Sequence, residues 1–153
     1  MDIKVTIPNL KQMQKAFSDA PQDMYREANN AIRSSIFKVE QQAVMESPID
    51  TGTLRKSIHQ GIVWGPLYGA VGPTVNYSIF VHEGTRPHTI SVRRAKVLYS
   101  RRSGRFFGRS VRHPGTKPNR FMKRAADQSQ RDINKFFKDA LERVVNNIAR
   151  KSK

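Results

Sequence analysis

The side chains best suited to bind a metal or transfer a proton are four histidines: His59, His82, His88 and His113. A zinc site needs three or four protein ligands that the fold brings together. His82 and His88 would supply two of them, but no third ligand follows at a convincing spacing. We therefore expect the histidines to form hydrogen bonds in loops, and we expect no metal and no cofactor.

Nucleophiles and carboxylates do not complete a catalytic constellation either. The chain has no cysteine, which removes thiol nucleophiles, thiolate metal sites and disulfides. Ser57 and Ser78 lack the G-x-S-x-G context of a nucleophile elbow. Asp50 and Glu83 would be the carboxylates of a nuclease, but an Asp before Thr-Gly typically closes a turn through its own side chain. A single acid in a cationic loop, such as Glu83, typically forms an ion pair. We therefore expect no catalytic residue and no enzyme.

Positive charge is concentrated in one segment of the chain. The 153 residues carry a formal net charge of +16, and residues 86–124 hold thirteen Lys and Arg with no acid. Three aromatic residues, Tyr99, Phe106 and Phe107, lie among these cations, a mixture typical of surfaces that bind nucleic acid. The alternatives are an acidic protein face and a solvated loop. The arginines expected to contact an acidic partner or DNA are Arg93, Arg94, Arg101, Arg102, Arg105 and Arg109.

Hydrophobic periodicity predicts helices in the first third of the chain. A short helix is expected over about 10–17, and a longer one from Pro21, a favoured first helical residue, to just before Ser47. Apolar residues from Met24 to Ala43 form a stripe on the longer helix, and Glu27 lies on the opposite face. This helix is therefore expected to pack on one side only.

The rest of the chain reads as strands followed by a helix. Short strands are predicted between Thr53 and Val111, including 77–81, which alternates with period two, and a hairpin with 101–104 at its tip. A helix over about 119–150, capped by Asn119, would be roughly 45 Å long, so its end is expected to meet a partner.

The expected fold class is α+β in one domain, 1–153: N-terminal helices, a central antiparallel sheet of short strands with a basic hairpin insert at about 86–112, and a long C-terminal helix. No apolar run approaches the roughly 20 residues that span a bilayer, and no secretory signal is visible. We expect a soluble chain made in the cytoplasm, with no membrane partner.

Three motifs in series resemble those of one protein family. SPIDTGTLRKSI (47–58) resembles a P-x-D-T-G-x-L-R-x-S signature, YSIFVHEGTRPH (77–88) a Y-x-x-(F/Y)-V-x-x-G-T block, and HPGTKPNRFM (113–122) an H-x-G-x-x-P-N-P-F-(M/L) block. These are motifs of the tail-completion or head–tail joining proteins of long-tailed phages, which are related to the virion morphogenesis proteins of Mu-like phages. The resemblance covers about residues 20–140. Arg120 stands where family members usually have proline, and the segment 93–112 is variable in the family.

The resemblance implies a structural virion protein of the neck, where head and tail join, made in the bacterial host cytoplasm. It implies a homo-oligomeric ring around the DNA channel, with a hexamer favoured and a dodecamer as the alternative. The implied partners are a head-closure or adaptor protein, a tail terminator or tail-tube protein, and packaged DNA through non-specific contact. Because neck rings must adhere at every subunit, the arginines are assigned with slight preference to an acidic protein face. A free-standing nucleic-acid-binding protein is the alternative function.

Stiff loops suit contacts between ring subunits, since every copy must present the same surface at the same angle. Gly52, Gly84 and Gly115 are expected at backbone angles closed to other residues. We expect the isolated chain to be monomeric or weakly associated and to close into a ring on its neck partners. The residues expected in inter-subunit loops are Pro48, Asp50, Thr51, Gly52, Leu54, Arg55, His82, Glu83, Gly84, Thr85, His113, Gly115, Pro118, Asn119 and Phe121.

Overall fold

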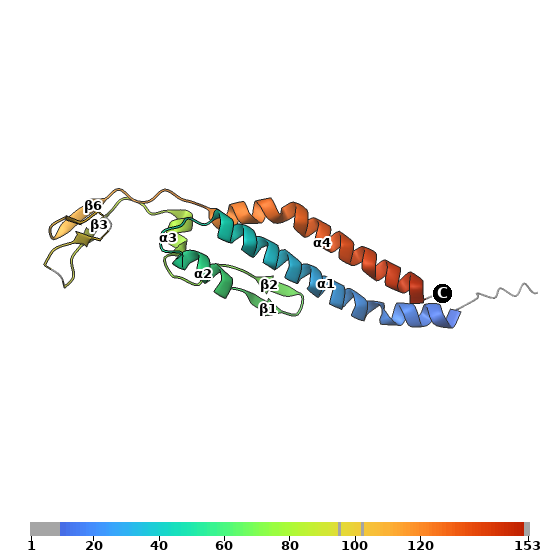
Figure 1. Cartoon of the computed structure of the whole chain (residues 1–153). Helices are drawn as coiled ribbons and strands as arrows, with labels where there is room; N and C mark the ends of the chain where they lie inside the picture. Colours follow the sequence, from blue (N-terminus) through green and yellow to red (C-terminus); the bar gives the residue numbers. More distant parts are fainter. Residues whose placement is uncertain (1–9, 95, 102, 152–153) are drawn as a thin grey trace, which may run out of the picture. The chain divides into compact units, whose positions relative to one another are not determined.

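The structure, a computed structural model, describes residues 10–94, 96–101 and 103–151 (Figure 1). Long helices and short antiparallel strands confirm the α+β class. The chain forms two compact units. The helical unit contains the described residues up to Thr74 and from Met122 onward, and the arm unit is Val75–Phe121. Arg102, one of the arginines expected at an anionic partner, lies outside the described residues.

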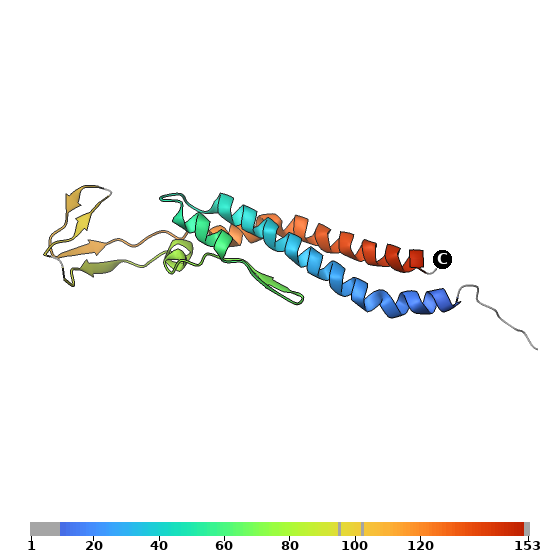
Figure 2. The same ribbon diagram turned by 60° about the horizontal axis from the view of Figure 1, so that its bottom comes forward.

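The first helix, α1, runs without interruption over Leu10–Glu46 and contains Pro21. The prediction of two helices separated before Pro21 is therefore wrong. An interior proline removes one backbone hydrogen bond and costs about 3 kcal/mol. Residues on both sides of it are nevertheless anchored, since Ala16 is 1% and Asp23 5% exposed. Figure 2 shows α1 changing direction in its N-terminal part, as expected of a helix with an interior proline.

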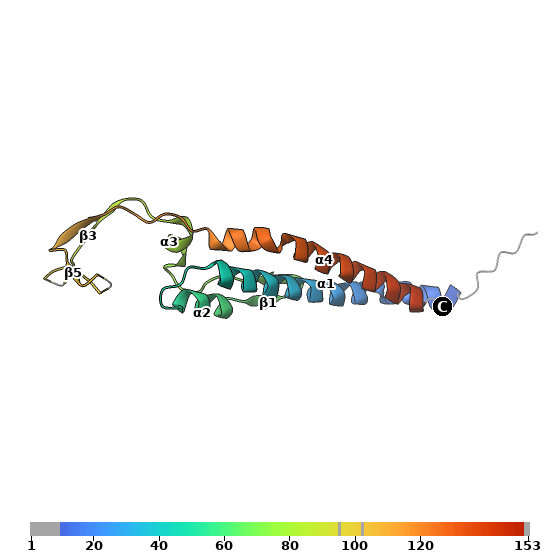
Figure 3. The same cartoon turned by 45° about the horizontal axis from the view of Figure 1, so that its top comes forward.

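The last helix, α4, spans Phe121–Lys151 and confirms the predicted C-terminal helix. It begins after Arg120, which has a left-handed φ of 49°, so the residue directly before the helix is Arg120 rather than Asn119. Within the helical unit α4 lies beside α1 (Figure 3). The buried residues of the two helices are mostly small: Ala16, Ala31, Ser35 and Ala43 on α1, and Ala125, Ser129, Ala140 and Val144 on α4.

Ion pairs between α1 and α4 define an antiparallel register. They are Glu46–Arg124 (2.6 Å), Lys38–Asp132 (2.8 Å), Glu27–Arg143 (2.7 Å) and Asp23–Lys151 (2.9 Å). Eight residues separate the first two pairs on both helices, and eleven separate the next two on both helices. Eleven residues are about three helical turns, so the pairs recur on the same side of each helix. Glu27, predicted on the exposed face, is only 8% exposed, so that prediction is wrong.

The cations of these pairs hold the pKa values of their acids below the usual range. The first cause in each case is a hydrogen bond donated to the carboxylate: from Lys151 to Asp23, from Arg143 to Glu27, from Arg124 to Glu46, and from Lys38 to Asp132. These acids therefore remain ionised at neutral pH and link the two helices.

A second face of α1 packs against β2 and α2. Helix α2 is Thr53–Gln60, and strands β1 (Val63–Gly65) and β2 (Tyr68–Ala70) form an antiparallel hairpin. The strand predicted to begin near Thr53 is thus a helix, because Leu54 and Ile58 are buried at a spacing of four residues. Gly69 lies so close to α1 that an added Cβ would be 2.8 Å from Ile36 Cγ1. The prediction that α1 packs on one side only is wrong.

In the arm unit, helix α3 (Ser78–Glu83) replaces the strand predicted over 77–81. Backbone amides of Phe80 and Val81 donate to the carbonyl of Tyr77, which starts the helical turn. Beyond it β3 (His88–Ser91) pairs with β6 (Ser110–His113), and β4 (Tyr99–Ser100) pairs with β5 (Arg105–Phe106). The β4–β5 pair confirms the predicted hairpin. The expected central sheet is divided into three two-stranded antiparallel sheets in the part of the chain that the structure describes.

Among the described helices, none is both long and apolar enough to cross a membrane.

Candidate functional site

The second and third motifs of the sequence pair with each other in the arm unit. Thr85 and Thr116 form an antiparallel bridge in which each backbone amide donates to the other's carbonyl, at 2.9 and 3.1 Å. The Thr116 amide also lies 3.0 Å from Thr85 Oγ1. The two segments share a short repeat, Gly-Thr-Arg-Pro at 84–87 and Gly-Thr-Lys-Pro at 115–118. We call them the paired loops. The repeat is the sequence signal that could have indicated their pairing.

Glycine is required at both ends of this bridge. Gly84 has φ 75° and ψ −176°, and an added Cβ would lie 2.4 Å from the Thr116 carbonyl oxygen. Gly115 has φ 88°, and its Cβ would lie 2.2 Å from the Thr85 carbonyl oxygen. Gly52, in the helical unit, has φ 79° with open space around it. The expectation of special backbone angles is confirmed at all three glycines.

Two histidines form hydrogen bonds with the backbone at the ends of the paired loops. His88 and His113 face each other across β3–β6 with ring centroids 5.1 Å apart. His113 Nδ1 accepts from the Gly115 amide at 3.1 Å, and His88 Nδ1 donates to the Arg86 carbonyl at 2.9 Å. These bonds confirm the expected loop hydrogen bonding.

Two further histidines pair with carboxylates. His82 Nδ1 lies 2.8 Å from Glu83 Oε1, so Glu83 has the expected ion-pair geometry. In the helical unit, His59 Nδ1 pairs with Glu40. Within the described ranges no three His, Asp or Glu side chains come together as a metal site would require.

The third motif folds back onto α3 within the arm unit. The Asn119 amide donates to the Val81 carbonyl at 3.1 Å, and the Arg120 amide donates to the His82 carbonyl at 3.0 Å. Phe121 is fully buried, and its ring meets the His82 ring edge-on at 5.5 Å. Phe121 is therefore a core residue of this motif, and its side chain offers no free surface to a neighbouring subunit.

The first motif lies in the helical unit and connects α1 to α2. Pro48, Asp50 and Thr51 are exposed, as an inter-subunit loop requires. Asp50 does not close the turn through its side chain as predicted, because Thr51 Oγ1 accepts from the Thr53 amide instead, at 3.4 Å. The expected role of this loop between subunits remains a prediction.

Two other residues of this motif have internal roles. Leu54 is buried in the helical unit. Arg55 Nη2 donates to the Ser47 carbonyl at the end of α1, at 3.3 Å. Arg55 therefore fastens α2 to the end of α1, a role that the sequence did not indicate.

The arm, residues 88–113, carries the basic side chains. Each of its described arginines is exposed, and none forms an ion pair with another described residue. On β4–β5, the rings of Tyr99 and Phe106 lie 4.9 Å apart, and Phe106 is 70% exposed. The two strand pairs of the arm are seen in Figure 2. The arm therefore displays unneutralised cations beside an exposed aromatic pair.

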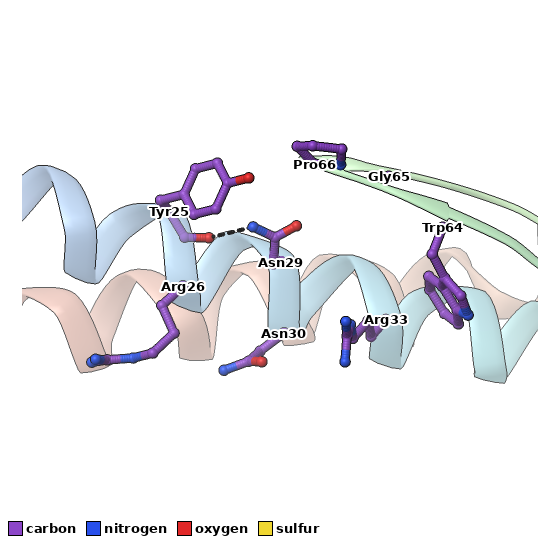
Figure 4. Close-up of a pocket in the computed structure, with 8 residues that line it drawn as sticks. All are labelled: Tyr25, Arg26, Asn29, Asn30, Arg33, Trp64, Gly65 and Pro66. Carbon is purple, nitrogen blue, oxygen red and sulfur yellow. Dashed lines mark hydrogen bonds between the residues drawn. The ribbon is translucent and has the colours of Figure 1, made fainter.

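A hollow on the helical unit was not indicated by the sequence (Figure 4). It has a volume of about 510 Å³ between α1 and the β1–β2 turn. The Leu67 amide donates to Asn29 Oδ1 at 3.0 Å, and the Arg33 guanidinium lies 5.7 Å from the centroid of the Trp64 ring. None of the eight lining residues is a carboxylate, a histidine or a serine. Its polar lining groups are the Tyr25 phenol, two side-chain amides and two guanidinium groups, so the hollow can hold a polar side chain of a partner.

The sequence matches no family model, no curated protein and no solved structure.

Proposed function

We propose that the chain is a structural subunit of the neck of a tailed phage, joining head and tail as part of a ring around the DNA channel, and that it is not an enzyme. The proposal is supported by three motifs that resemble those of tail-completion and head–tail joining proteins. It is also supported by the paired loops, which make one rigid feature from two of these motifs.

The observation that carries the proposal is the imbalance between buried and exposed apolar side chains in the helical unit. In the described part of the helical unit the buried apolar residues are mostly alanines, and the large ones among them are only Leu54, Ile58 and Val144. Large apolar side chains instead lie exposed along α1 and α4, among them Phe17, Met24, Phe137, Leu141 and Val145. We call these five residues the apolar face.

A groove of about 190 Å³ runs through the apolar face, and Met24, Phe137 and Leu141 line it. Exposed patches of this kind on soluble proteins typically mark contacts with other proteins. A ring subunit has such a surface because its neighbours complete the core. The ring is proposed to be hexameric, or dodecameric as the alternative, and to lie between a head-closure or adaptor protein and a tail terminator or tail tube.

The second candidate function is a free-standing nucleic-acid-binding protein. The described arginines of the arm, which are exposed and form no ion pair with another described residue, favour it. It predicts that the purified chain works alone, whereas a neck protein acts only in the assembled particle.

The test is complementation of a phage that lacks this gene, with the particles counted by electron microscopy. Without the gene we expect full heads and separate tails, and the wild-type gene should restore joined particles. Leu141→Lys, in the apolar face, should fail to restore them, because a charge would enter the proposed contact. Met45→Lys is the matched control, since Met45 is also exposed on α1 (65%) but lies outside the apolar face. Joined particles in the absence of the gene would reject the proposal.

A further inference from the structure

The side chains of the arm and its flanks are hydrogen-bond donors to an unusual degree. Between Glu83 and Asn119 the sequence has no Asp, Glu, Asn or Gln. The polar side chains there are Arg and Lys, which only donate, and Ser, Thr, Tyr and His, which can do both. The described cations of this stretch, all exposed, are Arg86, Arg93, Arg94, Lys96, Arg101, Arg105, Arg109, Arg112 and Lys117. Such a surface is suited to a partner whose surface consists mainly of hydrogen-bond acceptors.

One side of the two-stranded ribbon β3–β6 carries Arg112 and three hydroxyl side chains. Thr89 lies opposite Arg112, and Ser91 lies opposite Ser110, with 3.4 Å between the serine hydroxyl oxygens. Opposite residues of an antiparallel pair share a face. All of β3 is exposed, so no described element covers this ribbon. The exposed side of the ribbon is therefore free to lie along the phosphates of a duplex.

Phosphate is a better match than carboxylate for this surface. A protein face that attracts arginines through Asp and Glu also presents backbone amides and donor side chains, which need acceptors across the interface. Apart from hydroxyl and histidine groups, the arm has no side-chain acceptor for them, neither a carboxylate nor a side-chain amide. The backbone of DNA offers phosphate oxygens at regular intervals, and arginine binds them in bidentate fashion. The arm also lacks Asn and Gln, the side chains that read adenine, and its arginines would read guanine only if they reached the base edges in a groove.

We propose that the arm binds the phosphodiester backbone of duplex DNA without reading its sequence. This inference deepens the proposed function, because it names the partner of one surface of the neck subunit. Each phosphate engaged contributes about 0.9 to the slope of log affinity against log salt. If six arginines engage phosphates, the affinity should fall about a thousandfold between 50 and 200 mM salt.

The test is fluorescence anisotropy of the purified full chain with two labelled 24-base-pair duplexes of unrelated sequence, titrated at several salt concentrations. The arm variant changes Arg93, Arg94, Arg101, Arg105, Arg109 and Arg112 to Gln. The control variant removes the same charge from the helical unit, by changing Lys11, Lys15, Lys56, Arg131, Lys135 and Arg150 to Gln. These six form no ion pair with a described residue. A third variant carries Lys at the six arm positions.

We expect the wild type to bind both duplexes with equal affinity. The slope of log affinity against log salt should be smaller by at least three in the arm variant, but by less than one in the control variant. The lysine variant should keep the salt slope of the wild type. This result would show that the arm variant binds less because charge is lost and not because the arm unfolds. Equal losses in the arm and control variants would overturn the proposal, as would tighter binding of polyglutamate than of duplex. Because the assay uses purified protein, its failure leaves the joining role to be decided by phage complementation.

Discussion

At the scale of single residues, Gly84 carries a severe backbone constraint. Its φ and ψ lie in a region open essentially to glycine, and a Cβ would meet the Thr116 carbonyl oxygen at 2.4 Å. Gly84→Ala should therefore destabilise the paired loops by about 2 kcal/mol. This corresponds to roughly thirtyfold faster hydrogen exchange at the amides of Thr85 and Thr116. Hydrogen-exchange NMR measures it directly.

The matched control is Gly52→Ala. Gly52 also has positive φ, but nothing lies within 4 Å of its Cβ position, and it belongs to the helical unit. Its substitution should leave exchange at Thr85 and Thr116 unchanged. If Gly84→Ala also left these amides protected, the close approach between the paired loops would be disproved.

A second prediction at this scale concerns Arg143. Its Nε donates to Glu27 at 2.7 Å, and the Glu27 side chain is only 11% exposed. Arg143→Gln leaves that carboxylate only its longer pair with Arg26 at 3.4 Å, which should cost roughly 1–2 kcal/mol in urea unfolding followed by circular dichroism. Lys138→Gln removes an exposed pair with Glu142 at 3.9 Å and should change stability by less than about 0.5 kcal/mol. If both changes lowered the free energy of unfolding equally, the half-buried Glu27–Arg143 pair would contribute no more to stability than the exposed Lys138–Glu142 pair.

The sequence was informative about some of these residues and not about others. Glycines within motifs indicated their own backbone angles, because φ is a local property. The pairing of Thr85 with Thr116 joins positions 31 residues apart, and the alternation of residues says nothing about such contacts. Glu27 was placed on the exposed face because charge normally indicates solvent, and its partner on α4 lies 116 residues away.

At the scale of elements, the α1–α4 pair should be sensitive to acid. Four of its carboxylates have folded pKa values below their ordinary values, first because a cation donates a hydrogen bond to each. The unfolded chain binds more protons in that pH range, so stability rises with pH there. The contribution is complete above the unfolded values, near pH 4, and disappears as the pH falls through the folded values.

Glu46→Gln tests this linkage. At pH 6 the wild type should melt at a higher temperature than the variant, because Arg124 and Gln128 bind the Glu46 carboxylate. The gap should close as the pH falls below about 5 and through the lowered pKa of Glu46, since the wild-type carboxyl is then protonated. Asp127→Asn is the control, because Asp127 pairs with Lys123 on the exposed side of α4. A gap independent of pH would contradict the proposed linkage.

The elements also show where periodicity succeeds. The C-terminal helix was predicted within about two residues, because its apolar stripe continues over many turns. The segment 77–81 is too short to distinguish helix from strand, and none of the residues of α3 is buried, so its alternation did not reflect a half-buried strand. Pro21 indicated a helix start, but packing on both sides of it overrides that local preference.

At the scale of the whole molecule, charge and apolar surface should oppose each other in self-association. The net charge of +16 repels copies of the chain, whereas the apolar face attracts them. We expect weak association in light scattering, with an average mass that rises above 17.5 kDa as protein or salt concentration increases, since salt screens the repulsion.

Leu141→Lys should return the average mass toward the monomer, whereas Met45→Lys should have little effect. A stable large ring at micromolar concentration would contradict the expectation that closure needs the neck partners. A wild-type chain that stays monomeric at every salt concentration would show that the apolar face does not contact a second copy.

The last prediction brings the arm into the virion. The motifs alone gave a slight preference to docking of the arginines onto an acidic ring, but the many arginines of the arm and its lack of Asp, Glu, Asn and Gln favour DNA. A phage whose subunit has Gln at Arg93, Arg94, Arg101, Arg105, Arg109 and Arg112 should then produce joined particles that retain or eject DNA poorly, because contacts to passing phosphates are lost. Docking onto protein predicts separate full heads and free tails instead. Electron microscopy counts the two classes, and quantitative PCR on purified particles measures the retained DNA. Separate heads and tails would show that the arm binds a protein partner. Joined particles with normal DNA content and ejection would show that the arm contacts neither DNA nor a protein ring.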